Sequence, residues 1–225
     1  MGMGKLSVRE LMAKRAAQEV KNGMIVNLGI GIPSLIPNFL SENMQVMFHA
    51  ENGVLGMGPT PKKGQEDENL CNAAGLPVTI IPGASYFDSS LAFGIIRKGL
   101  LDLTVLGALQ VSEKGDLANW IVPGKRVPGI GGAMDLAQKS KKVIVLMNHC
   151  SKDGEPKILE NCTFPLTSKA CVDLIITEMA VIRVNKETNK LHLIEVLAPY
   201  TVEEVIEKTG APLVIEGDIL IYEGV

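Results

Sequence analysis

The feature that most constrains this chain is a succession of short, continuously apolar segments, each closed by glycine, proline or a helix-capping residue. Such segments are typical of strands buried on both faces of a sheet, because a strand with one wet face would alternate apolar and polar side chains. The predicted strands cover residues 24–28, 46–48, 78–81, 101–106, 143–147 and 172–177, with a late hairpin formed by 181–184 and 191–196. We therefore predict an α/β fold with a mostly parallel central sheet flanked by helices, in a single domain over residues 1–225.

Helix signals fill the segments between these strands. Ser7-x-x-Glu10 and Thr201-x-x-Glu204 have the capping-box pattern, in which the first side chain and the last each bond a free backbone N–H of the other. The first helix is expected to continue as far as Gly23. Asp88 is expected to cap a second helix that reaches residue 96, and Pro33 to open one over residues 34–40.

Composition excludes several classes of protein. Of the 225 residues, 46% are hydrophobic and 21% are charged, which rules out a disordered chain, and the net charge of −3 gives no sign of a nucleic-acid-binding face. No apolar run reaches the roughly 18 residues of a membrane span, and the N-terminal segment lacks the apolar core of a secretory signal. The four cysteines are dispersed and form no C-x-x-C pair. These observations favour a cytoplasmic chain with reduced thiols and with no membrane or nucleic-acid partner.

One acidic side chain stands at the end of a predicted strand. Ligands of parallel α/β folds bind at the carboxyl ends of strands, and strand 46–48 is followed by His49-Ala-Glu51-Asn-Gly53. The Asn-Gly pair predicts a sharp turn, which would lift Glu51 to the edge of the sheet. Spacing alone leaves two interpretations, a solvated loop glutamate and a reactive carboxylate.

The sequence gives little support for a metal site or a dinucleotide site. His49-x-Glu51 matches only the first half of the zinc deaminase signature, because P-C-x-x-C is absent. Gly29-x-Gly31 after a strand is a weak sign of a dinucleotide loop, because position 34 is serine rather than glycine. The three histidines have no metal-ligand spacing, so we expect no metal site.

A second unusual segment is rich in glycine. Gly129, Gly131 and Gly132 allow the backbone to approach a ligand closely and to aim N–H groups at an anion or a developing oxyanion. The neighbouring Lys125 and Arg126 are either solvated charges or contacts for a phosphate. Spacing alone also allows a plain flexible glycine loop.

These two segments together resemble a known family. Glu51-Asn-Gly within FHAENGVLGMGP, and the long block from Gly83 to Ala137 that contains PGIGGAMDLA, resemble the β subunit of family I coenzyme A transferases, of the 3-oxoacid or acetate/butyrate–acetoacetate type. The resemblance runs from about residue 5 to residue 210. Ala50 stands where the family usually has serine. The family's α-subunit signature is absent, which implies a separate α partner.

The resemblance implies the CoA-transferase (NagB/RpiA-like) fold and covalent catalysis. CoA would move from an acyl-CoA, such as succinyl-CoA or acetyl-CoA, to a short carboxylic or 3-oxo acid, such as acetoacetate or butyrate. The transfer would follow a ping-pong mechanism through a glutamyl-CoA thioester on Glu51, with coenzyme A as a substrate and no tightly bound cofactor. The other residues implied at the site are Asn52, Gly131 and Gly132 for catalysis, and Gly29, Gly31, Gly56, Gly58, Lys125 and Arg126 for CoA. Two alternatives stay open: an acyl-CoA hydrolase on the same scaffold, and a non-catalytic subunit that senses CoA or a sugar phosphate.

Overall fold

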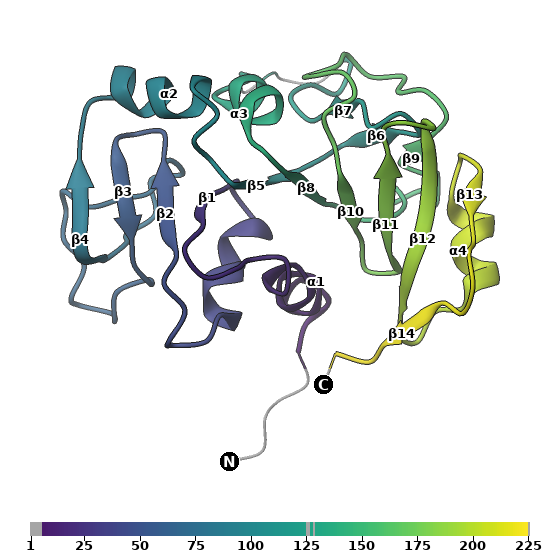
Figure 1. The fold of residues 1–225 in the computed structure, drawn as a ribbon, viewed down its shortest axis with the longest axis horizontal. Coiled ribbons are helices and arrows are strands. Elements are labelled where there is room, and N and C mark those ends of the chain that lie inside the picture. The colour runs from purple at the N-terminus through teal and green to yellow at the C-terminus, as the bar shows by residue number, and fades with distance from the viewer. Residues whose placement is uncertain (1–5, 125–126, 128, 225) are drawn as a thin grey trace.

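A computed structural model describes residues 6–124, 127 and 129–224, and its central element is an eleven-stranded sheet. Across the sheet the order is β13-β12-β11-β10-β8-β5-β1-β2-β3-β4, and β14 also pairs with β12 (Figure 1). The strands are β1 (Ile25–Leu28), β2 (Met47–Ala50), β3 (Val54–Met57), β4 (Ile80–Tyr86), β5 (Leu103–Gly107), β8 (Val143–Leu146), β10 (Leu174–Ile176), β11 (Ala180–Asn185), β12 (Lys190–Leu197), β13 (Leu213–Val214) and β14 (Leu220–Tyr222).

The middle of the sheet is parallel, and antiparallel pairs lie on either side of it, beyond which β13 and β14 pair in parallel with β12. β2, β1, β5, β8 and β10 pair in parallel, whereas β3 and β4 on one side, and β11 and β12 on the other, add antiparallel pairs. The predicted α/β architecture with a mostly parallel centre is therefore confirmed. The carboxyl ends of β1, β2 and β5 meet at one edge of the sheet, as their parallel registers require.

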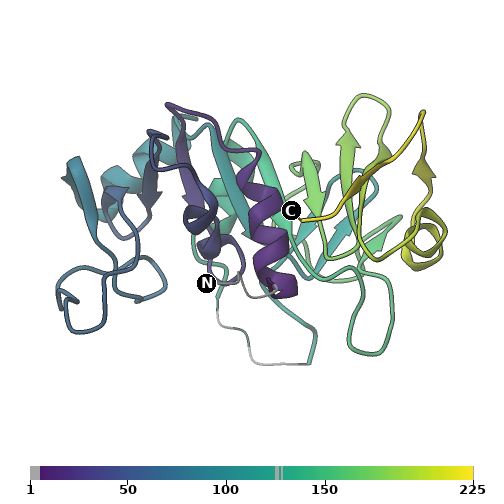
Figure 2. The same cartoon turned by 90° about the horizontal axis from the view of Figure 1, so that it is seen from below.

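Helices cover both faces of the eleven-stranded sheet, and a separate small sheet lies beside it (Figures 1 and 2). The helices are α1 (Val8–Ala17), η1 (Pro33–Phe39), α2 (Ser89–Arg97), α3 (Ala133–Lys139) and α4 (Val202–Lys208). A separate three-stranded sheet contains β6 (Gln110–Ser112), β7 (Leu117–Ala118) and β9 (Ile158–Leu159). Among the described residues, no helix combines the length and apolar character needed to cross a membrane.

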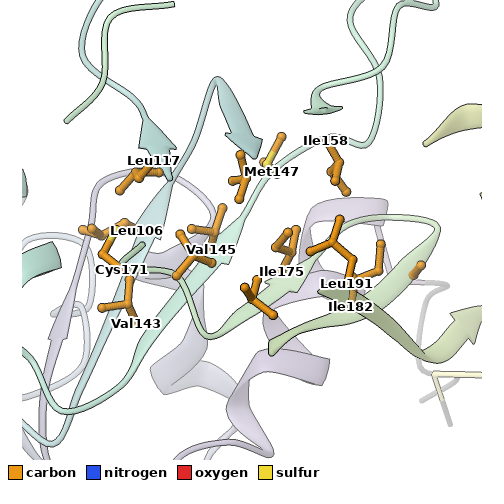
Figure 3. Packing of buried hydrophobic residues seen from close by; sticks show 14 of the residues in the cluster. Leu106, Leu117, Val143, Val145, Met147, Ile158, Cys171, Ile175, Ile182 and Leu191 are labelled. Carbon is orange, nitrogen blue, oxygen red and sulfur yellow. The ribbon is translucent and has the colours of Figure 1, made fainter. Parts of the chain in front are cut away.

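Alternate residues of the central strands serve two hydrophobic cores. Val143 and Val145 of β8 pack in the cluster that includes α2, α3 and the small sheet, part of which Figure 3 shows. Ile144 and Leu146 of the same strand point to the opposite face and pack with α1 and η1. Burial on both faces explains why the strand sequences are continuously apolar.

The capping boxes form as predicted. Ser7 Oγ accepts from the backbone N–H of Glu10 at 3.3 Å, while Glu10 Oε2 accepts from the Ser7 N–H at 2.8 Å. Thr201 and Glu204 make the same reciprocal pair at 3.2 and 2.8 Å. Asp88 caps α2 by accepting from Leu91 N at 2.8 Å. These local signals were sufficient to fix three helix starts.

Two predicted boundaries and one predicted helix type were wrong. Helix α1 ends at Ala17 rather than near Gly23, and Val20 reaches the core from a turn. The strand expected to end before Pro82 continues through it to Tyr86, because β4 lies at the sheet edge, where a missing N–H breaks no ladder. The helix after Pro33 is of the 3₁₀ type and contains Pro37, whose ring and missing N–H disfavour an α-helix.

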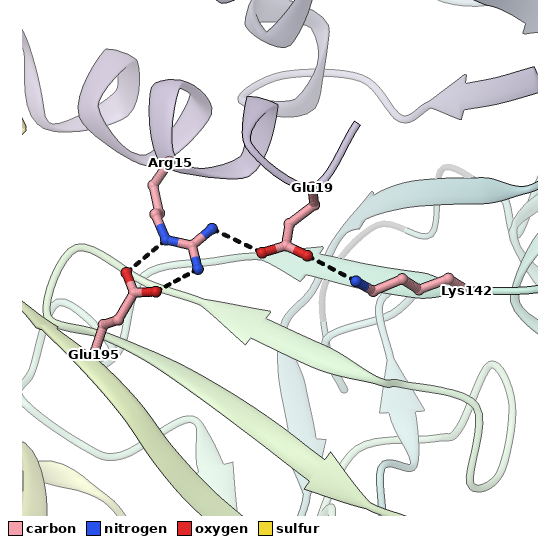
Figure 4. Close-up of polar contacts among 4 residues, drawn as sticks. All are labelled: Arg15, Glu19, Lys142 and Glu195. Atoms are coloured by element: carbon pink, nitrogen blue, oxygen red, sulfur yellow. Dashed lines mark hydrogen bonds and ion pairs between the residues drawn. The ribbon is translucent and has the colours of Figure 1, made fainter. Parts of the chain in front are cut away.

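A buried ionic network attaches α1 to the sheet (Figure 4). The Arg15 guanidinium donates to both carboxylate oxygens of Glu195 on β12 at 2.6 Å, and to Glu19 at 2.9 Å. Glu19 also accepts from Lys142 at 2.7 Å. The Arg15 side chain is only 6% exposed. A two-pronged Arg–carboxylate pair of this kind fixes the register of a helix on a sheet.

Candidate active site

Glu51 occupies the turn of the β2–β3 hairpin, directly after the carboxyl end of β2. The Gly53 N–H donates to Ala50 O at 3.1 Å, and Gly53 O accepts from Phe87 N at 3.0 Å. Gly53 has a φ of +109°, and a Cβ there would lie 1.9 Å from Phe87 O, so only glycine fits. The turn that presents Glu51 is thus fixed by backbone contacts on both sides.

The glycine segment before α3 lies against this carboxylate. A Cβ built on Gly132 would lie 3.2 Å from Glu51 Cγ and 3.3 Å from Glu51 Oε1. It would also lie 3.3 Å from Cε1 of the Phe93 ring on α2. The absence of a side chain at position 132 is therefore what allows Glu51 to sit against this backbone. The fold brings together the two segments that the sequence singled out.

Gly131 and Gly132 lie directly before α3 and border the larger of two cavities at this site. Neither donates a hydrogen bond to another described residue, although Gly132 O accepts from Leu136 N at 3.0 Å at the start of α3. Gly131 has a φ of +55° and Gly129 a φ of +108°, which turn the chain sharply before the helix. Backbone N–H groups of such a glycine segment can serve an incoming oxyanion.

Two cavities meet at Glu51. The larger, of about 840 Å³, extends toward α2 and α3 and is bordered by Phe93, Leu106–Leu109, Asn119 and residues 129–133. The smaller, of about 60 Å³, extends toward η1 and is bordered by Ser34, Phe48, Ala50, Met57 and Val78 among others. The residues that border both are Leu28, Gly29, Ile30, Glu51 and Ala73. The site lies at the carboxyl ends of β1, β2 and β5, as predicted for this sheet type.

The other glycines singled out from the sequence are placed differently from one another. Gly29 borders both cavities and Gly58 borders the smaller one, but Gly31 and Gly56 border neither. A Cβ on Gly56 would lie 2.9 Å from Cα and Cβ of Ala84 on β4, so this glycine allows close strand packing. The two cations expected at CoA phosphates, Lys125 and Arg126, lie outside the described residues.

Asn52 contacts a neighbouring loop. Its side-chain amide nitrogen donates to Cys71 O at 2.8 Å, and the exposed Asn52 also borders the larger cavity. The loop beyond Cys71 is folded by Asn72, whose Oδ1 accepts from Ala74 N at 2.9 Å and Leu76 N at 3.0 Å. Asn52 therefore connects the β2–β3 hairpin to the wall of the smaller cavity.

A buried polar row behind Glu51 escaped the sequence analysis. His49 on β2, Asn27 on β1 and Thr104 on β5 are neighbours across the sheet and are completely buried. Asn27 Nδ2 donates to His49 O at 3.1 Å, and Thr104 Oγ1 donates to Asn27 Oδ1 at 3.5 Å. Burial lowers the pKa of His49, because the charged imidazole would lose its hydration. Within the described part of the chain no cluster suited to a metal ion includes it.

The sequence also did not single out Asn119 and Phe93 as residues that border a cavity. Asn119 Nδ2 donates to Gly107 O at 3.1 Å, and its Oδ1 accepts from Thr167 Oγ1 at 2.6 Å. Both residues border the larger cavity, and the Phe93 ring lies near the place that a side chain at position 132 would occupy. Neither stands in a pattern that spacing alone would distinguish from ordinary packing.

Comparisons with known proteins agree with this geometry. Residues 9–208 match the family model described as coenzyme A transferase. The chain is 60% identical over 216 residues to the probable coenzyme A transferase subunit beta of Bacillus subtilis, an alignment that covers 96% of this chain and 98% of that protein. It is 53% identical over 203 residues to the mitochondrial succinyl-CoA:3-ketoacid coenzyme A transferase 2A of Rattus norvegicus, covering 90% of this chain but 39% of the rat protein.

Solved structures share the fold at low sequence identity. An acyl-CoA transferase from Escherichia coli O157:H7, solved as a thioester complex with CoA, superposes with a TM-score of 0.76 at 22% identity and covers all of this chain and 44% of that one. Glutaconate coenzyme A-transferase from Acidaminococcus fermentans gives a TM-score of 0.75 at 17% identity, with 98% and 90% of the two chains covered. On the family model and the closely similar sequences, the resemblance stated from the motifs is confirmed, and this chain belongs to the coenzyme A transferase family.

Proposed function

We propose that this chain is the β subunit of a CoA-transferase that moves CoA from an acyl-CoA to a short carboxylic or 3-oxo acid. The observation that carries the proposal is the Glu51 carboxylate, held against the Gly132 backbone at the junction of two cavities. The fold by itself does not decide the reaction, since a decarboxylase also superposes on this chain with a TM-score of 0.72. The proposal therefore rests on the residues of the site.

The proposed reaction is a sequence of acyl exchanges. A Glu51 carboxylate oxygen attacks the thioester carbonyl of the acyl-CoA. The C–S bond of the resulting tetrahedral adduct then breaks, which releases CoA as a thiolate and leaves an acyl–glutamyl anhydride. The thiolate then attacks the Glu51 carbonyl carbon and expels the acyl group as a free carboxylate, which leaves a glutamyl-CoA thioester. The acceptor acid attacks this thioester and the same steps run in reverse. Because every step exchanges one acyl bond for another, no ATP is consumed.

The glycine segment has a defined part in this proposal. Each attack creates a tetrahedral oxyanion, and the Gly132 backbone lies against the Glu51 carboxylate, which takes part in each of them. We assign the backbone N–H groups of Gly131 and Gly132 to this oxyanion. Loss of one such donor typically costs roughly 3 kcal/mol of transition-state stabilisation. The backbone bonds of the β2–β3 turn make a second contribution to the reaction rate, because an oriented nucleophile has an effective molarity of about 10⁵ M or more.

A partner subunit is part of the proposal. The larger cavity is open, and its described border contains no lysine, arginine or histidine, although CoA carries several phosphate charges. An anhydride intermediate also needs protection from water. This chain spans 39% of the rat relative and 44% of the E. coli acyl-CoA transferase, so the active protein in those cases has much more chain. We infer that an α subunit closes the site and supplies charges, together with Lys125 and Arg126.

The covalent intermediate provides the test. The α and β subunits are purified together, incubated with acyl-CoA without acceptor, and the mass of this chain is measured. The expected result is an increase equal to bound CoA, which disappears in Glu51→Gln and persists in Glu187→Gln, a matched change at an exposed turn. Transferase turnover by Glu51→Gln comparable to that of the unchanged protein would refute the mechanism.

A further inference from the structure

We infer that His49 is a positioning residue for the proposed reaction: a neutral imidazole, with its one ring proton on Nε2, holds the β2–β3 turn and helix α2 in the arrangement that sets Glu51 against Gly132. The inference rests on the proposed function and deepens it. Its starting point is that His49 is completely buried and that its Nε2 has no hydrogen-bond partner among the described residues. A buried polar atom without a partner lowers stability, so a fold tolerates one chiefly where it serves the site.

The buried polar row that contains His49 lies directly beneath the larger cavity. The row crosses β2, β1 and β5, whose residues 49, 27 and 104 are in register. Side chains two positions apart along a strand share a face of the sheet. The next residues on this face are Glu51, Gly29 and Leu106, and all three border the larger cavity. The row is therefore the layer of side chains that supports the floor of that cavity.

The contacts of Asn27 locate the ring proton of His49. Asn27 Nδ2 donates to His49 O at 3.1 Å, and the same nitrogen lies 3.4 Å from His49 Nδ1. A carbonyl oxygen can only accept, so the contact with His49 O orients the amide with its NH₂ group toward His49. Thr104 Oγ1, 3.5 Å from Asn27 Oδ1, agrees with this orientation. Because Nδ1 faces a donor, it must accept, which leaves the ring proton on Nε2.

The imidazole also packs against the residue that holds the Glu51 turn. Its ring stacks on the Phe87 ring, with 6.3 Å between the centroids and 25° between the planes. The Phe87 N–H donates to Gly53 O at 3.0 Å, and Phe87 O occupies the space in which a side chain at position 53 would lie. A displaced imidazole would therefore move Phe87, and with it the turn that presents Glu51.

Helix α2 is the second element beside the imidazole. Burial lowers the pKa of His49, and the Ala92 backbone of α2, which lies near the ring, offsets part of this effect. The next residue of α2 is Phe93, whose ring lies beside the place that a side chain at position 132 would occupy. One buried ring thus joins the turn that carries Glu51 to the helix that borders the glycine segment. Because the Nδ1 contact anchors this ring to β1, loss of the ring nitrogens should let both elements shift.

A phenylalanine substitution separates the ring nitrogens from the ring itself. His49→Phe keeps a flat ring that can stack on Phe87, but it removes the contact with Asn27. A misplacement of about 1 Å costs roughly 100-fold, so a shift of a few tenths should slow acyl transfer in the αβ complex by about three- to tenfold. Water needs no such alignment, so the ratio of acyl-CoA hydrolysis to transfer should rise by about the same factor, while the KM for acyl-CoA stays unchanged. This ratio does not depend on how much of the variant is folded.

His149→Phe is the matched control. His149 is also completely buried, and its ring nitrogens bond Thr177 and Thr209. It follows β8, which β5 and β1 separate from β2. The hydrolysis-to-transfer ratio of His149→Phe should equal that of the unchanged protein. An unchanged ratio in His49→Phe, or an equal rise in His149→Phe, would overturn the inference.

The ring proton is located by NMR in an αβ complex in which only this chain carries ¹⁵N-histidine. Correlation spectra that join the carbon-bound ring protons to the ring nitrogens distinguish the two neutral tautomers from the cation. The His49 signals, identified by their loss in His49→Phe, should show a protonated Nε2 and an unprotonated Nδ1 at neutral pH. A cationic ring, or one with its proton on Nδ1, would contradict the inference.

The proposed function and the role of His49 fail in different ways. If Glu51→Gln retains acyl exchange, the proposed function fails. If exchange depends on Glu51 but His49→Phe leaves the hydrolysis-to-transfer ratio unchanged, only the role of His49 fails.

Discussion

Replacing Gly132 by alanine would place a methyl group between the glycine segment and the proposed nucleophile. That methyl carbon would lie 3.2 Å from Glu51 Cγ, and 3.3 Å from both Glu51 Oε1 and Phe93 Cε1. Comfortable contacts between such atoms begin at about 3.5 Å, so the neighbours must retreat by a few tenths of an ångström. The φ of −83° at this position suits alanine, so the change should act through contact rather than backbone strain.

The size of the effect follows from the displacement. A misplacement of about 1 Å in an active site can cost roughly 100-fold, so a few tenths should slow acyl exchange by about three- to tenfold. Gly107→Ala is the matched control, because Gly107 also borders the larger cavity and a Cβ there meets nothing within 4 Å. Initial rates of exchange are measured for both variants in the αβ complex. Unchanged activity in Gly132→Ala, or an equal loss in Gly107→Ala, would refute this account of the contact.

Four further predictions concern the site and the scaffold. Glu51→Asp withdraws the carboxylate by about one methylene, so exchange should fall about 100-fold while a larger share of the acyl-CoA is hydrolysed, measured as thiol release with and without acceptor. Thr201→Ala should lower the free energy of unfolding by about 1 kcal/mol in urea titrations, through loss of the α4 cap. Arg15→Ala should cost about 3–5 kcal/mol because it leaves Glu195 buried and unpaired, whereas the double replacement of Arg15 by Met and Glu195 by Leu should recover most of it. Burial lowers the pKa of His149 to about 4, so the unfolded chain takes up a proton at a higher pH than the folded chain does. The free energy of unfolding should therefore fall as the pH drops from 6.5 toward 4, by up to about 3 kcal/mol. This dependence on pH should weaken in His149→Gln.

Local sequence signals correctly predicted those features that depend on local contacts alone. The two capping boxes fixed the starts of α1 and α4, because the partners are three residues apart and need no tertiary context. The Asn-Gly turn predicted the position of Glu51 for the same reason. In contrast, α3 was missed because its N-cap is Gly132, which has no side chain to signal a helix start. Strand β3 was missed because its short run lies between glycines, and those glycines suggested a loop.

Glycine roles needed the neighbours that only the fold provides. Gly56 and Gly132 look alike in the sequence, since each lies in a glycine-rich segment near an apolar run. In the structure Gly56 makes room for Ala84 of the adjacent strand, whereas Gly132 makes room for Glu51. Spacing can say that a close approach occurs at such positions, but not which group approaches. The row of His49, Asn27 and Thr104 was hidden for the same reason, because each residue lies on a different strand.

The way Glu51 is held is itself consistent with a nucleophile. No described residue gives its carboxylate a hydrogen bond or an ion pair, whereas Arg15, Glu19 and Glu195 show how firmly this chain can bind charged groups elsewhere. Hydrogen bonds and cations that favour the free carboxylate would also make it less reactive. Orientation must then come from the backbone, and the bonds of Gly53 to Ala50 and Phe87 supply it. A turn fixed by backbone bonds, with no described residue bound to its carboxylate, therefore suits the role proposed for Glu51.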